Sequence, residues 1–229
     1  MQPIFIITVF ALFFIGVIIF GAWLSARRRK ELGAWAASRG LSFDPAKDHS
    51  MESRCPALSA LRQGSNRYAY NIIQGSWSER PVLAFDYHYE TYSTDSKGNR
   101  QTHHHHFSVI ALGSDVPLKP LFIRPEGFFD KITEFFGADD IDFESAEFSR
   151  KFFVKAEDRR WAYDVIHTRT MEFLLGQPRF SIQFDSGQVY VWRTSTFRPS
   201  DFECAIETAL GILDRFPEYL VKQLRDNLS

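Results

Sequence analysis

The sequence contains little cysteine, almost no net charge and none of the common catalytic fingerprints. Two cysteines among 229 residues are too few for a disulfide scaffold or a cysteine-rich zinc module. Lysine and arginine together number 27 against 28 acidic residues, so the basic excess typical of nucleic-acid binding is missing and we expect no nucleic-acid partner. The G-x-S-x-G, G-x-x-x-x-G-K-S/T, G-x-G-x-x-G and H-E-x-x-H patterns do not occur. These absences favour a protein without catalytic activity.

Charge is also missing from the N-terminal segment. No charged residue lies between Pro3 and Ala26, and Thr8 is the only clearly polar residue up to Leu24. About 20 apolar residues suffice to cross the hydrocarbon core of a bilayer as a helix. The run is longer than the ~7–15 apolar residues of a signal peptide, and no basic residue precedes it. We therefore expect a retained transmembrane anchor over residues 1–26.

Four cations follow this segment at once: Arg27, Arg28, Arg29 and Lys30. Lysine and arginine beside a membrane span stay on the cytoplasmic side. The four cations therefore predict a single-pass protein of the cell (inner) membrane, with its N-terminus outside and its C-terminal domain cytoplasmic. Indole rings suit the headgroup level, and cations attract anionic lipid. We thus expect Trp23 and the four cations to form the membrane-surface residues.

The predicted organisation has three parts: an anchor over residues 1–26, a basic juxtamembrane helix over 27–40 that ends at Gly40, and a cytoplasmic domain over 41–229. In the domain, strand-like patterns occur at 67–74, 81–92, 102–112, 121–124, 148–155, 179–185 and 188–194. Helical spacing occurs at 128–136, at 158–175 with a break near Thr168, and after a capping box formed by Ser200 and Glu203. The strands follow one another as hairpins. This order predicts an α+β fold with a mainly antiparallel sheet and packed helices.

Five of the seven histidines lie between positions 88 and 106, on two strands that should pair as a hairpin. Odd positions, including Phe85, Phe107 and Val109, are apolar and should face the core, so the even positions should face solvent. The even set brings together imidazoles and carboxylates: Asp86, His88, Glu90, His104, His106 and Ser108.

Imidazole and carboxylate are ligands of zinc, nickel, copper and non-heme iron. The pattern therefore predicts a divalent transition-metal site formed by His88, His104, His106, Glu90 and Asp86. An ordinary polar strand face is the alternative, because an exposed strand must be polar in any case.

The junction W-A-x-x-R-G-L-x-F, from Trp35 to Phe43, follows the single predicted span and its basic cluster, and an aromatic hairpin with the histidine tract comes after it. In this combination the chain resembles uncharacterised bacterial single-pass membrane-anchored proteins. The resemblance implies a bacterial cytoplasmic-membrane setting and supplies no catalytic residues.

Three functions are compatible with these patterns. The first is a membrane-tethered cytoplasmic interaction or scaffold module without catalytic activity, whose partners are the lipid bilayer and a protein at the membrane. The second is a metal sensor or metal-dependent enzyme that uses the histidine cluster. The third is a lipid-binding domain, because the chain carries 23 phenylalanines and stays near the headgroups.

Overall fold

The structure, a computed structural model, describes residues 2–127 and 141–226, without the side chains of residues 2–9 and 11. The helices are α1 (Gln2–Ser38), α2 (Met51–Arg54), the 3₁₀ helix η1 (Ser59–Arg62), α3 (Ala146–Lys151), α4 (Arg159–Val165), α5 (Thr168–Leu175), α6 (Pro199–Leu213) and α7 (Glu218–Asp226). The strands are β1 (Ser42–Asp44), β2 (Ser65–Trp77), β3 (Arg80–Thr94), β4 (Arg100–Gly113), β5 (Leu121–Pro125), β6 (Phe152–Ala156), β7 (Ser181–Asp185) and β8 (Gln188–Arg193).

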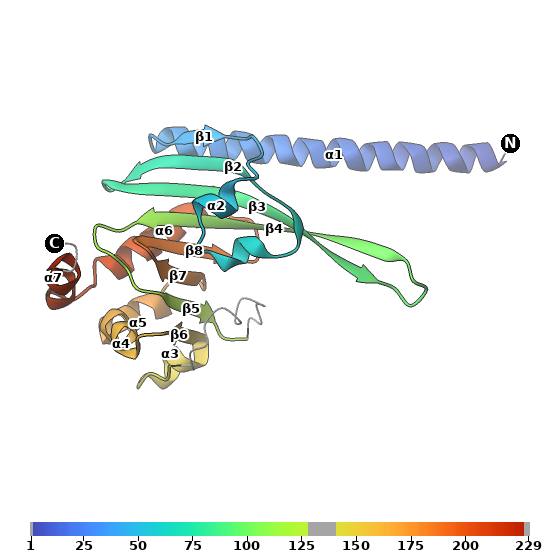
Figure 1. Ribbon diagram of the computed structural model, residues 1–229. Helices are drawn as coiled ribbons and strands as arrows, with labels where there is room; N and C mark the ends of the chain where they lie inside the picture. The colour runs from blue at the N-terminus through green and yellow to red at the C-terminus, as the bar shows by residue number, and fades with distance from the viewer. Residues whose placement is uncertain (1, 128–140, 227–229) are drawn as a thin grey trace.

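All eight strands form one antiparallel sheet in the order β1-β2-β3-β4-β8-β7-β5-β6. Helices pack on this sheet (Figure 1), so the predicted α+β class is confirmed. The strands β2, β3 and β4 are long, and the histidine region lies on β3 and β4. The turn between β7 and β8 falls at Ser186 and Gly187, as the sequence predicts.

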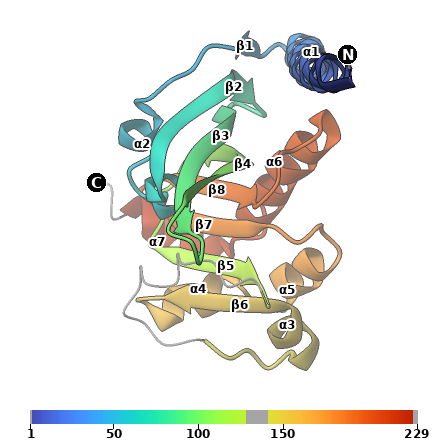
Figure 2. The ribbon, with the colours of Figure 1, turned by 90° about the vertical axis from the view of Figure 1, so that its right-hand side faces the viewer.

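Apolar side chains are buried on both faces of the sheet. On one face, Leu32 and Ala36 of α1 share a core with α6, which lies beside β4 and β8 in Figure 2. On the other face, the short helices α2 and η1 cover β2, β3 and β4 with a second core that contains Phe85 and Phe107. The sheet is therefore a middle layer rather than a surface layer.

This arrangement corrects the predicted solvent face of the hairpin. The apolar odd positions are buried as expected, including Phe85, Phe107 and Val109. Asp86 and Ser108 are also fully buried, because Arg28 of α1 binds Asp86 and the chain just before α6 binds Ser108 on the face that we expected to meet water. His88 is only 3% exposed and lies against the rings of Tyr68, His104 and His106.

Helix α1 is continuous over 37 residues, and its N-terminal half extends beyond the sheet (Figure 1). Large apolar side chains between Phe10 and Leu24 are 45% to 69% exposed, whereas Leu32 and Ala36 are fully buried. Among the described residues, no helix is both long enough and apolar enough to cross a membrane. The span predicted over residues 1–26 includes residues 2–9 and 11, whose side chains the structure does not describe.

Local predictions were wrong at two helix starts. The strand expected over 148–155 begins only at Phe152, because Ser145 caps the short helix α3 through the backbone N–H of Phe148. Helix α6 begins at Pro199 rather than after a Ser200 cap, and Asp201 accepts the backbone N–H of Arg198 at 2.8 Å. The break between α4 and α5 before Thr168 is confirmed, and the helix predicted over 128–136 lies outside the described residues.

Strands β3 and β4 continue past their neighbours as a two-stranded ribbon, which we define as residues 91–103. Strand β2 pairs with β3 only as far as Glu90, and β8 pairs with β4 only from Ser108. Within the ribbon, Thr91 lies opposite His103 and Thr94 lies opposite Arg100. The ribbon projects in the same direction as the N-terminal half of α1 (Figures 1 and 2).

Candidate functional site

Polar side chains form a continuous stripe on the face of β2, β3 and β4 that α1 approaches. Three residues of β3 define the stripe: Asp86, His88 and Glu90. They point to one face because side chains two positions apart in a strand share a face. The stripe begins under α1 and ends at the root of the ribbon.

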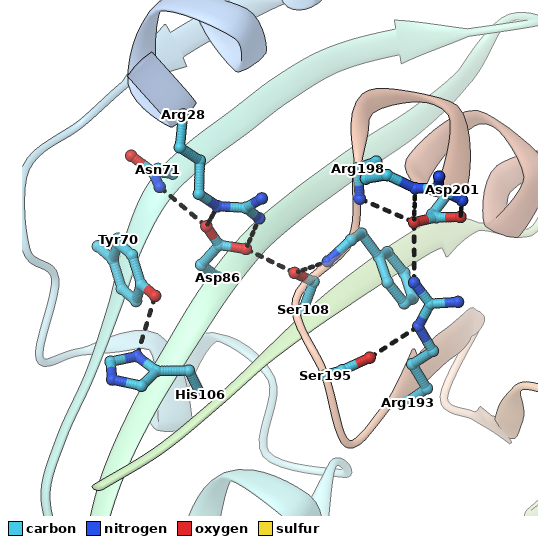
Figure 3. Close-up of polar contacts among 11 residues, drawn as sticks. Arg28, Tyr70, Asn71, Asp86, His106, Ser108, Arg193, Ser195, Arg198 and Asp201 are labelled. Carbon is cyan, nitrogen blue, oxygen red and sulfur yellow. Dashed lines mark hydrogen bonds and ion pairs between the residues drawn. The ribbon is translucent and has the colours of Figure 1, made fainter. Parts of the chain in front are cut away.

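The Asp86 carboxylate is fully buried and accepts four hydrogen bonds (Figure 3). Arg28 of α1 donates two of them, from Nε at 2.9 Å and Nη2 at 2.7 Å. Asn71 Nδ2 donates at 2.8 Å and Ser108 Oγ at 2.5 Å. Ser108 Oγ accepts in turn the backbone N–H of Phe197 at 2.8 Å, just before α6. One carboxylate thus connects α1, β2, β4 and the start of α6.

This ion pair has the geometry in which charge-assisted hydrogen bonds are strong. A guanidinium that meets both oxygens of a carboxylate fixes orientation as well as charge. A buried carboxylate left without its cation costs about 3–5 kcal/mol, which is far more than the loss of an exposed pair. Arg28 therefore fastens α1 to the sheet.

Two bulges in β2 place the side chains that support the carboxylates of β3. The pairing register shifts between Ser65 and Tyr68 and again between Tyr70 and Ile73. Asn66 and Asn71 lie in these two bulges with φ of 48° and 52°, a left-handed conformation that asparagine tolerates better than most residues. Asn71 donates to Asp86, and Asn66 Nδ2 donates to Glu90 Oε1 at 2.6 Å.

His88 is held by one hydrogen bond and one stacked ring. Its Nδ1 donates to the backbone carbonyl of Asn66 at 3.0 Å, since a carbonyl oxygen can only accept. The ring of Tyr68 stacks on the imidazole with centroids 4.5 Å apart. The hydrogen bond to the carbonyl fixes the tautomer with the proton on Nδ1, so Nε2 of the neutral ring carries the lone pair.

The lone pair of His88 points into a group of three potential ligand atoms. His88 Nε2 lies 3.2 Å from His104 Nδ1, which lies 3.4 Å from Glu90 Oε1. One ligand atom from each of these residues falls within 4.8 Å of the other two. The hydrogen bond from Asn66 lowers the pKa of Glu90, and Tyr92 adds a hydrogen bond to Oε2 at 3.1 Å.

Two of the five predicted ligands do not join this group. Asp86 is occupied by Arg28, Asn71 and Ser108. His106 lies directly opposite His88, but its Nδ1 is 3.0 Å from the hydroxyl of Tyr70. Burial and the charge of Asp86 raise the pKa of Tyr70, so the phenol stays protonated beside His106. The structure thus brings together His88, His104 and Glu90.

The other two histidines of the tract face the opposite side of the hairpin. His105 stacks on Tyr89 with centroids 4.6 Å apart, and its Nε2 is 2.8 Å from Thr91 Oγ1. His103 Nε2 is 2.7 Å from Ser93 Oγ. A cleft of about 450 Å³ opens beside His105, with a mixed aromatic and polar lining that includes Gln63 and Trp192. A lipid-binding domain would be expected to enclose an apolar cavity, and this cleft has a mixed lining. Lipid binding therefore stays a prediction.

The predicted membrane-surface residues are divided by the structure. Arg28 turns toward the sheet, where Asp86 holds it, so it does not extend toward headgroups with its neighbours. Arg27 forms an exposed pair with Glu31 at 2.8 Å and also lies 5.7 Å from the ring of Trp23. Arg29 donates to the carbonyl of Ser25, and Lys30 is exposed.

The fold is an α+β architecture in which a long N-terminal helix packs on an eight-stranded antiparallel sheet. No protein-family profile and no curated protein sequence matches the chain. Among solved structures, the chain is similar to the crystal structure of the mycobacterial trehalose monomycolate transport factor A, TtfA. The TM-score is 0.57 over 81% of this chain and 92% of that chain, with 16% sequence identity. With sequence identity this low, the structural similarity shows a shared fold alone.

Replacing Arg28 with alanine should strongly destabilise the chain. The change leaves the buried Asp86 carboxylate without its cation, which we expect to lower the free energy of unfolding by about 3 kcal/mol. The matched control is Arg27→Ala, which breaks an exposed i,i+4 pair and should cost less than about 0.5 kcal/mol. Urea unfolding of the detergent-solubilised chain measures both. Equal effects of the two changes would contradict the role assigned to Arg28.

Proposed function

We propose that this chain is a non-catalytic module that is anchored in the cell membrane and binds a membrane protein through the ribbon. The observation that carries this proposal is the common direction of the ribbon and the apolar half of α1 (Figure 1). The two features extend from the same side of one folded body.

The anchor rests on the composition and exposure of the first half of α1. The sequence holds no charge from Pro3 to Ala26. The large apolar side chains from Phe10 to Leu24 do not pack on the domain, and their exposure to water would be costly. Insertion of this half into a bilayer removes that cost.

The orientation follows from the cations beside the apolar half. Arg27, Arg29 and Lys30 remain at the surface of α1 and can stay on the cytoplasmic side of the membrane. The N-terminus then lies outside and the sheet domain lies in the cytoplasm. Arg28 contributes little to this asymmetry because its charge is compensated by Asp86.

The ribbon supplies the argument for a protein partner. It extends toward the region that the apolar half of α1 would occupy in the membrane, yet it carries Asp95, Lys97 and Arg100. Charged side chains and unpaired strand edges are costly in hydrocarbon. A polar surface of another membrane protein avoids this cost.

The ribbon also has the backbone needed for such contact. Among the described strands, none pairs with the outer edge of β3 beyond Glu90 or with that of β4 before Ser108. Exposed strand edges bind partner chains through main-chain hydrogen bonds.

Anchoring can be tested by deleting residues 2–24. We expect the full chain in the membrane fraction and the shortened chain in the soluble fraction. Protease added to the outside of intact cells should leave the domain whole. In the full chain, changing Arg27, Arg29 and Lys30 together to glutamine should expose part of the population to that protease, because the charge asymmetry is lost. Digestion of the unchanged chain would refute the orientation.

Partner binding can be tested with a photo-crosslinking residue at Gln101 of the ribbon. We expect a discrete adduct with one membrane protein in intact cells, and its loss when residues 2–24 are deleted. The control position is Glu172, an exposed residue of α5, which should give no such adduct. Equal adducts at the two positions, or adducts at Gln101 with lipid alone, would contradict the proposal.

A further inference from the structure

The group His88, Glu90 and His104 has the dimensions of a metal site. Zinc binds imidazole nitrogen and carboxylate oxygen at about 2.0–2.2 Å, which separates neighbouring ligand atoms of a tetrahedral site by about 3.3 Å. Nε2 of His88 lies 3.2 Å from Nδ1 of His104, and Nδ1 of His104 lies 3.4 Å from Oε1 of Glu90. Two of the three separations thus match the edge of such a tetrahedron, and all three donor atoms lie within 4.8 Å of one another.

The surroundings orient these donors as metal ligands require. A ligating imidazole usually donates its other N–H to a backbone carbonyl or a carboxylate, and His88 donates Nδ1–H to the carbonyl of Asn66. Glu90 is held by Asn66 and Tyr92 through separate oxygens. His104 has a side chain that is 58% exposed, so water can reach a fourth coordination position.

We propose that His88, Glu90 and His104 bind one zinc ion, with water as the fourth ligand, and that the ion fastens the root of the ribbon. Glu90 of β3 lies directly opposite His104 of β4, so the ion bridges the two strands at the last pair before the ribbon begins. A two-stranded ribbon is only marginally stable by itself, and a bridge at its root restricts opening of the strands. The site does not depend on the partner proposed above, because zinc binding is a property of the isolated chain.

The opposite face of the same tract provides a matched control. His103 and His88 are both hairpin histidines, but His103 pairs with Ser93 on the other face and lies outside the ligand group. A site built across two strands needs His88. Binding by a run of surface histidines needs the tract and is indifferent to His88.

The test is calorimetric titration of Zn²⁺ into the full chain, purified in detergent without a polyhistidine tag. We expect one ion per chain, at least about tenfold weaker binding for His88→Ala and less than about twofold change for His103→Ala. Glu90→Gln keeps the size of the side chain and should also weaken binding at least about tenfold. This variant decides the matter if His88→Ala fails to fold.

A second readout follows the ribbon itself. At a Zn²⁺ concentration ten times the dissociation constant, strand opening that breaks the site should become about tenfold rarer. Amide hydrogen exchange at residues 91–103 should slow accordingly, and it should not respond to Zn²⁺ in Glu90→Gln. Binding that survives His88→Ala and Glu90→Gln, or that is lost equally with His103→Ala, would overturn the proposal.

Discussion

The buried carboxylate of Asp86 is the constraint on which the arrangement of this molecule depends. It is fully removed from water, so the fold must bring a cation and further donors to it. Arg28 supplies the cation from a helix 58 residues earlier in the chain, and Asn71 and Ser108 complete the set from the neighbouring strands. A slip of α1 along the sheet would separate this pair. The long helix and the sheet therefore form one body, and no linker intervenes between the apolar half of α1 and the domain.

The same arrangement occurs twice on β3, with a different outcome each time. Asp86 and Glu90 point to the same face, and each is supported by an asparagine from a bulge of β2. A guanidinium compensates the first carboxylate, whereas imidazoles surround the second. The first is a structural ion pair because both partners are fixed and largely buried. The second opens to solvent at His104, and this difference makes it the place where an external cation can bind.

The sequence predicted the class of fold and the hairpin pairing because periodic apolar residues and turn residues are local signals. Pairing of even positions across the hairpin also predicted His88 near His104 or His106; His106 lies directly opposite His88, and His104 lies 3.2 Å from it. The burial of Asp86 could not be predicted, since helix α1 was interpreted only as an anchor followed by a basic juxtamembrane helix. The burial of His88 depends on the rings of Tyr68, His104 and His106, which the strand pattern alone does not place around it. The bulges were missed as well, although asparagines at 66 and 71 beside and within an otherwise strand-like run are the signal that could have indicated them. Metal and membrane-surface roles were assigned by residue type, so Asp86 and Arg28 were placed in two separate sites.

Rigid coupling of α1 to the ribbon is the central claim, and a distance distribution between spin labels tests it directly. The labels belong at Ser25→Cys of α1 and Gln101→Cys of the ribbon, in a full chain whose native Cys55 and Cys204 are replaced by alanine. Pulsed electron paramagnetic resonance in detergent should give a single narrow distribution of label distances with Arg28 present and a broad one in Arg28→Ala. A broad distribution with Arg28 present, or the same narrow one without it, would contradict the account.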